Sequence, residues 1–308
     1  MDPVIFSIDI LGLSLTLRWY GVLIATGILI AVWVTAREVK RRGENPDYVW
    51  DGLLWVVPAG IAGARLWYVA NATLGGSRHY IDNPAQIFNV PAGGLHIYGA
   101  ILLGALAAWL YARHYKIDMW LLLDAVAPAL LLGQAAARPA NFINQELYGP
   151  PTDLPWGIAI SAQNRIAPWT DLGLYPEAST RFHPTFAYEI IWNVLAAVLL
   201  LWLARRMGKE LRPGTIFAGW LILEGAGRFL VEFFRPDQPR VPGTGISITS
   251  VVTALMALVG ALLLLVKYER VRVPFLAPGE TGYSLAPSKA APKVPEKKRR
   301  GKRKKKAR

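Results

Sequence analysis

The sequence predicts an all-α polytopic membrane protein of about seven transmembrane helices, with a small extracytoplasmic cap and a disordered basic C-terminal tail. Three observations predict this fold class. Hydrophobic residues make up 53% of the 308 residues, they gather in blocks about twenty residues long, and the loops between blocks alternate in basic content. About twenty apolar residues are needed for a helix to cross a hydrocarbon core about 30 Å thick, whereas a soluble domain would spread such residues at helical or strand spacing.

The apolar blocks are expected to be the transmembrane helices. They cover residues 17–36, 49–70, 93–113, 119–137, 185–204, 215–234 and 246–266. The first block lacks a cleavage site of small residues, so we interpret it as a retained span and not as a signal peptide. No repeat of fixed period is found, and the odd number of spans argues against two equal transporter halves.

Basic residues are frequent after the first, third and fifth blocks and scarce after the second and sixth. The frequent set comprises Arg37, Lys40, Arg41, Arg42, Arg113, Lys116, Arg205, Arg206, Lys209 and Arg212. The positive-inside rule therefore predicts an extracytoplasmic N-terminus and a cytoplasmic C-terminus. Residues 1–272 would then form the membrane domain, with extracytoplasmic loops at about 71–92 and 138–184.

Residues 273–308 form the predicted cytoplasmic tail. From residue 289 onward it holds twelve basic residues against Glu296, which is +11 of the whole net charge of +13. A segment of Pro, Ala and Lys cannot build a core, so we expect it to lie near anionic lipid headgroups. RNA binding by this run is the weaker alternative, because the rest of the chain is nearly neutral, and no nucleic-acid partner is expected.

The sixth block carries more ionisable residues than a simple span tolerates. Four of them share one stripe of a helix because they are spaced 4, 4 and 3 residues apart: Glu224, Arg228, Glu232 and Arg235. Charges inside a membrane usually face a site or each other. A self-neutralising ladder of ion pairs is one interpretation. A functional site is the other, and it is favoured because Gly225 and Gly227 would leave room beside Arg228.

A second polar cluster follows the fourth block. If the helix continues past Pro139, Arg138, Asn141 and Gln145 share one face and Asn144 lies close by. Arginine binds phosphate through two parallel hydrogen bonds, and amides donate to ester or hydroxyl oxygens. The cluster therefore predicts a site for an anionic headgroup, and interfacial capping explains only one or two of these residues.

His96 and Tyr98 stand near the expected start of the third span. Histidine is a candidate general base and tyrosine a candidate acid or donor. The alternatives are a structural histidine and an aromatic anchor at the interface. Two residues apart on a helix, the side chains point to different sides, so both cannot easily serve one substrate atom.

One run of the sequence resembles a family signature. The pattern R-x-x-N-F-I-N-x-E-x-x-G is similar to that of the prolipoprotein diacylglyceryl transferase family, and here comprises Arg138, Asn141, Phe142, Ile143, Asn144, Glu146 and Gly149. Further similarity covers RWYG at 18–21, GGLHIYGAILLG in the third span, HPTFAYE at 183–189 and RFLVEFFR at 228–235. The resemblance spans about residues 15–270 and omits the tail.

The resemblance implies an activity and a set of residue roles. The family is a seven-span enzyme of the bacterial inner membrane that moves the diacylglyceryl group of phosphatidylglycerol to the lipobox cysteine thiol of a preprolipoprotein and releases glycerol 1-phosphate. No metal or organic cofactor is implied, and because the chain has no Cys, the attacking sulfur belongs to the substrate. Catalytic roles are expected for Arg138, Arg228, Tyr98 and His96. Binding of phosphatidylglycerol is expected for Arg138, Asn141, Asn144, Glu146, Gly149, Tyr20, Glu232 and Arg235.

The sequence also departs from the family pattern. Tyr98 stands where the family commonly has a proposed base, a histidine, and His96 is displaced from that position by two residues. A tyrosine hydroxyl ordinarily loses its proton near pH 10 and is a poor base at neutral pH. Two alternatives follow. Either Tyr98 is a hydrogen-bond donor, or an arginine-rich site lowers the pKa of the substrate thiol without a dedicated base. Glu224 replaces a tyrosine and Phe186 a glutamine.

The sequence leaves two rival functions open. A transporter or flippase would use the charged stripe to line a path for an anionic solute or lipid. The polar residues gather toward the predicted outer half, which favours an enzyme. A homologue that has lost catalysis together with its histidine is the second rival.

Overall fold

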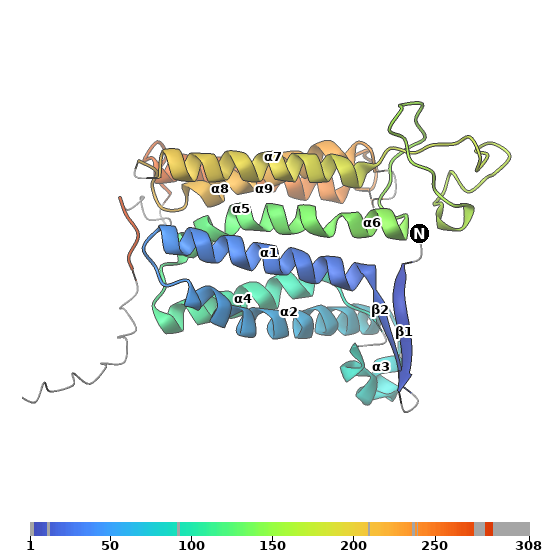
Figure 1. Cartoon of the computed structure of the whole chain (residues 1–308), viewed down its shortest axis with the longest axis horizontal. Coiled ribbons are helices and arrows are strands. Elements are labelled where there is room, and N and C mark those ends of the chain that lie inside the picture. The colour runs from blue at the N-terminus through green and yellow to red at the C-terminus, as the bar shows by residue number, and fades with distance from the viewer. Residues whose placement is uncertain are drawn as a thin grey trace, which may run out of the picture.

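The computed structural model describes residues 3–10, 13–90, 93–208, 210–235, 238, 240–273 and 281–285. Within these residues, seven helices of 18 residues or more lie side by side in a bundle (Figure 1). They are α1 (Trp19–Arg41), α2 (Asp47–Leu74), α4 (Ile97–Tyr115), α5 (Met119–Ala137), α7 (Thr185–Arg206), α8 (Thr215–Glu232) and α9 (Ile248–Lys267). Each coincides with a predicted block to within a few residues.

Among the described residues, five segments are long and apolar enough to cross a membrane: α1, α2, Met119–Asn144, α7 and α9. The third of them joins α5 to the short α6 (Pro139–Asn144). α8 holds three ionisable residues, and the last turn of α4 holds Arg113 and His114. Composition alone therefore does not identify either helix as a membrane span. The chain is a multi-pass membrane protein, and the assignment of α4 and α8 as spans stays a proposal.

The helices form three layers, and small residues let the helices of a layer touch. α2 packs on α4, α1 on α5, and α8 on α9 and α7, with the α1–α5 pair in the middle (Figure 1). A Cβ atom on Gly63 of α2 would lie 2.2 Å from the Gly99 carbonyl oxygen of α4. Gly27 of α1 meets Gly133 of α5 in the same way, at 2.5 Å. Without a hydrophobic driving force in lipid, such backbone approach is a main source of helix packing.

The predicted role of the glycines beside Arg228 is wrong. A Cβ atom on Gly227 would lie 2.1 Å from Trp192 Nε1 of α7, and one on Gly225 would lie 2.6 Å from the Thr253 carbonyl oxygen of α9. These glycines admit neighbouring helices, not a ligand. The Trp192 indole is held there by donating to the Leu223 carbonyl oxygen at 2.8 Å.

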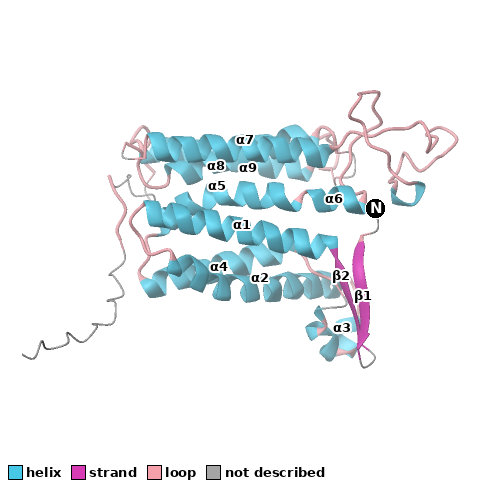
Figure 2. Ribbon diagram, viewed as in Figure 1, coloured by secondary structure: helices cyan, strands magenta, loops and turns pink. Residues whose placement is uncertain are grey.

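A two-stranded antiparallel sheet precedes the bundle, so an all-α fold class was incomplete. β1 (Val4–Ile10) pairs with β2 (Leu13–Arg18), placing Val4 opposite Arg18 and Ile8 opposite Leu15 (Figure 2). The sequence LSLTLR alternates apolar and polar residues with a period of two, which is a strand signal.

The hairpin, the long loop and the segment between α2 and α4 all lie at one end of the bundle (Figure 1). That segment contains α3 (His79–Asp82) and η1 (Pro84–Phe88). Arg65 of α2 holds it by donating to the carbonyl oxygens of Gln86, Ile87 and Gly93. The long loop, which includes η3 (Ala162–Asn164), has a small core of its own made by Tyr148, Ile160, Trp169 and Phe182.

The opposite end of the bundle holds the described basic loops and residues 281–285. There the buried Asp124 of α5 accepts hydrogen bonds from the Gly214 and Phe217 amides, both at 2.7 Å, and from the Tyr283 hydroxyl at 2.8 Å. Asp124 thus caps the start of α8 from a neighbouring helix, where the first amides have no partner of their own. The basic residues predicted to form the tail lie outside the described residues.

Candidate functional site

Two arginines share one buried carboxylate at the end of the bundle that carries the long loop. Arg228 Nη1 of α8 lies 2.6 Å from Glu189 Oε1 of α7, and Arg138 Nη2, at the junction of α5 and α6, pairs with Glu189 Oε2. The Glu189 side chain is 6% exposed, against 17% for Arg138 and 31% for Arg228. The carboxylate therefore fixes two guanidinium groups from different helices, and parts of both remain accessible.

The charge of this arginine pair suits an anion. Taken by themselves, the two guanidinium groups and the Glu189 carboxylate carry a net charge of +1, opposite to the charge of a phosphodiester. The planar guanidinium group of arginine makes paired hydrogen bonds to phosphate oxygens. Because Glu189 already holds both guanidinium groups, their side chains lose little further conformational entropy when phosphate binds. The arrangement is thus chemically prepared for a singly charged phosphate.

The signature run surrounds Arg138 with amides. Pro139 occupies the first turn of α6, where its missing amide donor costs nothing. Arg138 Nη1 donates to Asn141 Oδ1 at 3.4 Å, and Asn141 Nδ2 donates to Glu146 Oε1 at 2.8 Å. Asn144 Nδ2 reaches the same Glu146 oxygen at 3.4 Å. Arg138, Asn141, Asn144 and Glu146 therefore form one connected polar network.

Gln145 does not share the face of Arg138, contrary to the sequence-based expectation. The helix ends at Asn144, because Gln145 adopts a left-handed conformation with φ of 54°. Its side chain instead accepts from the Ser161 amide at 2.7 Å and from Asn164 Nδ2 at 3.1 Å. Gln145 thus joins the signature run to the long loop.

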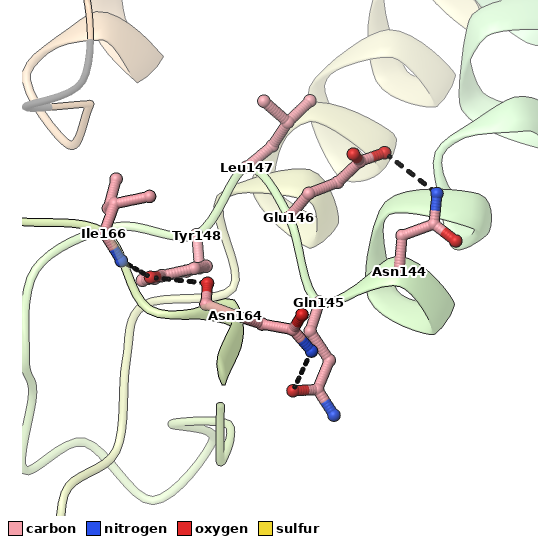
Figure 3. Close-up of a pocket in the computed structure, with 7 residues that line it drawn as sticks. All are labelled: Asn144, Gln145, Glu146, Leu147, Tyr148, Asn164 and Ile166. Carbon is pink, nitrogen blue, oxygen red and sulfur yellow. Dashed lines mark hydrogen bonds between the residues drawn. The ribbon is translucent and has the colours of Figure 1, made fainter. Parts of the chain in front are cut away.

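A partly open cavity of about 320 Å³ lies beside this network (Figure 3). It is lined by Asn144, Gln145, Glu146, Leu147, Tyr148, Asn164 and Ile166. The Tyr148 hydroxyl donates to the Asn164 carbonyl oxygen at 3.1 Å and accepts from the Ile166 amide at 2.7 Å. Amide and carboxylate groups therefore line a space that could take a small hydroxylated group.

Gly149 allows the signature run to pack against α7 and α8. Its amide donates to the His183 carbonyl oxygen at 2.9 Å. A Cβ atom there would lie 2.9 Å from His183 Cβ and 2.9 Å from the Phe234 carbonyl oxygen. Thr185, the first residue of α7, donates its hydroxyl to the Leu147 carbonyl oxygen. Glu189 lies one turn further along α7, so this contact sets its position relative to Arg138.

A hydrogen-bonded chain also ties the long loop to the start of α7. Trp156 Nε1 donates to the Tyr188 hydroxyl at 2.9 Å, and this hydroxyl lies 2.9 Å from His183 Nδ1. Burial lowers the pKa of His183 below its ordinary value of 6.5. The imidazole is therefore neutral at pH 7 and adds no charge beside the arginine pair.

The charged stripe of α8 is not a simple ladder. The close ion pair of Arg228 goes to Glu189 of α7 and not along its own helix. Glu224 and Glu232 are buried, with exposed fractions of 9% and 8%. Among the described residues, Glu224 Oε2 and Glu232 Oε1 have no hydrogen-bond partner. Arg235 lies beyond the end of α8, where its amide donates to the Glu232 carbonyl oxygen.

His96, Tyr98 and Tyr20 lie at the same end of the bundle on other helices. The His96 and Tyr98 rings are 5.1 Å apart and both contact Trp67 of α2. His96 precedes α4 and Tyr98 lies in its first turn, and the α1–α5 layer stands between α4 and α8. Tyr98 is 62% exposed and Tyr20, at the start of α1, is 43% exposed. In the described part of the chain, no hydrogen bond, ion pair or ring contact joins them to Arg138 or Arg228.

Sequence reasoning missed three polar residues of this site. Glu189 lies in the HPTFAYE segment at 183–189, and nothing in that segment alone indicates that it pairs with two arginines. Asn193 Nδ2 of α7 donates to Gln134 Oε1 of α5 at 3.1 Å, and Gln134 is hydrogen-bonded to Glu224. The available signal was a polar residue inside an apolar block, which usually faces a site or a partner.

Comparison with known proteins gives a consistent result. Residues 3–266 match the sequence profile of a family described as prolipoprotein diacylglyceryl transferase. A protein of Chloroflexus aggregans named phosphatidylglycerol–prolipoprotein diacylglyceryl transferase is 38% identical over 282 residues, which cover 87% of this chain and 91% of the relative. Relatives with the same name from Leifsonia xyli subsp. xyli and Thermosynechococcus vestitus are each 40% identical. These alignments cover 84% and 73% of this chain, and 77% and 79% of the respective relatives.

Proposed function

The chain belongs to the prolipoprotein diacylglyceryl transferase family and is a transferase of lipoprotein biosynthesis, and we propose how its site performs the transfer. The donor is phosphatidylglycerol, and the acceptor is the lipobox cysteine thiol of a preprolipoprotein signal peptide. The sulfur forms a thioether with the diacylglyceryl group, and glycerol 1-phosphate leaves. The rival function of a transporter or flippase has no support in the comparisons.

The observation that carries the proposed mechanism is the pairing of Arg138 and Arg228 on Glu189. The two guanidinium groups hold the phosphodiester of the lipid. As the bond from the glyceryl carbon to the phosphate oxygen breaks, a second negative charge develops on the leaving phosphate. Guanidinium donors that are already in place stabilise that charge in a site poor in water, and this electrostatic contribution is usually the largest in catalysis.

The signature network recognises the rest of the headgroup. Asn141 and Asn144 are oriented by Glu146, and the adjoining cavity has room for the terminal glycerol with its two hydroxyl groups. Gly149 keeps this wall of the site close to α7 and α8. Glu232, Arg235 and Tyr20 are proposed to complete the lipid site from α8 and α1.

His96 and Tyr98 are proposed to contact the reacting groups from α4. Tyr98 serves as a hydrogen-bond donor, because a tyrosine hydroxyl is a poor base at neutral pH. Replacing Tyr98 by Phe removes only that hydroxyl. We expect kcat to fall by about 100-fold, the lower end of the range for a lost donor to a developing charge, measured with a lipobox peptide. Full activity of this variant would remove Tyr98 from the catalytic residues.

The proposed setting is the bacterial inner membrane, with seven spans and an extracytoplasmic N-terminus. The loops at residues 71–92 and 138–184 would then face outward together with the site, where a translocated signal peptide presents its cysteine. The basic loops would face the cytoplasm, as the positive-inside rule requires. No cofactor takes part in the proposed reaction.

The test uses purified protein, phosphatidylglycerol and a synthetic lipobox peptide. Glycerol phosphate release is followed for the unmodified protein, for Arg138→Ala and for Arg206→Ala, which removes an exposed arginine at the opposite end of the bundle. We expect release that requires the peptide, is lost in Arg138→Ala and is retained in Arg206→Ala. No release by the folded unmodified protein would contradict the function and favour a homologue that has lost catalysis.

A further inference from the structure

We propose that Glu224 is the general base that takes the proton from the acceptor thiol. The inference rests on the transfer reaction proposed above and adds a catalytic residue to it. Neither arginine can accept a proton, and Glu189 is occupied by both of them. The proton of the thiol therefore needs a different acceptor near the reacting carbon.

The burial and bonding of Glu224 fit this role. The residue is 9% exposed. Gln134 of α5 is hydrogen-bonded to its carboxylate, and Asn193 of α7 holds Gln134 in turn at 3.1 Å. The second oxygen, Oε2, is buried and has no hydrogen-bond partner among the described residues. A buried polar atom without a partner is costly, so a structural carboxylate would be expected to use both oxygens. One oxygen of Glu224 is oriented and the other is free.

The charged groups that interact with Glu224 are the two arginines and their shared partner Glu189. Its carboxylate interacts with Arg228 of its own helix, with Arg138 at the α5–α6 junction, and with Glu189 of α7. The only charged residue in the sequence of α9 is Lys267, at the opposite end of the bundle. Among the described residues, Glu224 interacts with both arginines and yet forms a close ion pair with neither of them. A proton accepted here stays next to the phosphate that departs.

Glu224 lies on the side of Arg228 from which the acceptor thiol would attack the glyceryl carbon. It precedes Arg228 by four residues, which places it about 6 Å further along α8 toward the middle of the bundle. When Arg228 holds the phosphate, the glyceryl carbon and the acyl chains extend in that same direction, into the hydrocarbon. Displacement at carbon places the sulfur opposite the leaving oxygen. The thiol must therefore approach from the side on which Glu224 lies.

The step balances without any further reactant. Glu224 accepts the thiol proton, and the resulting thiolate attacks the glyceryl carbon that is esterified to phosphate. A carbon–sulfur bond forms and the carbon–oxygen bond breaks, with its electron pair passing to the phosphate oxygen. Glu224 then returns the proton to the glycerol 1-phosphate dianion, and the carboxylate is restored for the next cycle.

His96 is the alternative base, and its surroundings differ. Its ring packs against Trp67 and Tyr98 in the α2–α4 layer, and its Nδ1 has no described hydrogen-bond partner. The recorded contacts of His96 include neither arginine that would hold the phosphate. Glu224 is preferred because it lies one helical turn from Arg228 on α8 and its buried Oε2 has no partner among the described residues.

The experiment compares Glu224→Gln with Glu269→Gln in glycerol phosphate release across a range of pH. Glutamine keeps the size of the side chain and its bond to Gln134. Glu269 is a matched control, because it pairs with Arg212 at the opposite end and its side chain is 57% exposed. For Glu224→Gln we expect kcat at pH 7 to fall by about 10²–10⁴-fold with an unchanged KM for phosphatidylglycerol. Its rate should rise toward pH 8.5, where a cysteine thiol ionises without help.

A second measurement makes the test independent of the folded fraction. A selenocysteine peptide carries a selenol that is already ionised at neutral pH. The ratio of its rate to that of the cysteine peptide should be much larger in Glu224→Gln than in the unmodified protein and in Glu269→Gln. Equal ratios, or a loss of rate that is the same at every pH, would overturn the role of Glu224. Absence of peptide-dependent release from the unmodified protein would instead overturn the proposed function.

Discussion

Glu189 is the single residue on which the proposed site depends most. Its carboxylate is the partner of both Arg138 and Arg228, so its replacement affects two guanidinium groups at once. A glutamine has one acceptor oxygen and can hold only one of them. Hydrogen bonds to charged groups contribute about 1.5–3 kcal/mol. We therefore expect Glu189→Gln to lower kcat/KM for phosphatidylglycerol by roughly 10- to 150-fold.

The control for this prediction is Glu177→Gln, which alters an exposed carboxylate in the long loop at the same end of the bundle. Steady-state kinetics with varied lipid concentration should separate the two variants. Equal kcat/KM values for Glu189→Gln and the control would show that the two arginines do not need their shared partner.

Gly149 is the second residue whose replacement has a defined consequence. A methyl group there meets the backbone oxygen of Phe234 and the Cβ atom of His183, both at 2.9 Å, so the signature run must move. Overpacking of this kind costs about 1–3 kcal/mol. We expect Gly149→Ala to lower the melting temperature and the transfer rate together.

Gly245 provides the matched control for Gly149, because a Cβ atom there meets nothing within 4 Å. Thermal unfolding in detergent and glycerol phosphate release should both be unchanged in Gly245→Ala. A Gly149→Ala protein that behaves like this control would contradict the proposed tight packing.

The sequence predicted part of this site for physical reasons. Arg138 and Arg228 could be recognised because a charged residue next to or within an apolar block is costly in a membrane and usually serves a site or an ion pair. Their common partner could not, because Glu189 is 39 residues from Arg228 in the chain and only the packing of α7 against α5 and α8 brings the three together. Gln145 was misplaced because nothing in the sequence showed that the helix would end one residue earlier.

At the scale of the elements, the position of α8 depends on Asp124. This buried carboxylate accepts two amides from the start of α8 and the Tyr283 hydroxyl. Removing it leaves buried donors unpaired, at about 1–3 kcal/mol for each. We expect Asp124→Ala to lower the free energy of unfolding, measured in detergent, and to lower activity because α8 carries Arg228.

Tyr283→Phe gives a graded comparison for Asp124→Ala. It removes only one of the three donors, so its loss of stability should be smaller. If both variants unfold at the temperature of the unmodified protein, Asp124 does not fix the start of α8.

The positions of the seven long helices were well predicted, because a block of about twenty apolar residues is the length that a membrane-spanning helix needs. The hairpin β1–β2 was not predicted. Its second strand alternates apolar and polar residues, but this alternation is short and adjoins the first long apolar block. The contacts of Gly225 and Gly227 were also misjudged. A glycine in a span can leave space for a ligand or for another helix, and the sequence does not show which helix lies beside it.

At the scale of the whole molecule, the proposed orientation can be tested because the chain has no Cys. Single cysteines would be introduced at Gln163, exposed in the long loop, and at His114, exposed at the opposite end of the bundle. In intact cells, a membrane-impermeant maleimide should label Gln163→Cys and leave His114→Cys unlabelled until the cells are opened. The reverse pattern would place the arginine pair on the cytoplasmic side.

The proposed reaction yields one covalent product, a diacylglyceryl thioether on the acceptor cysteine. The most direct measurement is the mass of a lipobox peptide after incubation with the protein and phosphatidylglycerol of one defined acyl composition. We predict that the peptide gains one complete diacylglyceryl group, that the adduct resists hydroxylamine, and that Arg138→Ala abolishes it. An unmodified peptide, or a single acyl group that hydroxylamine removes, would contradict the account.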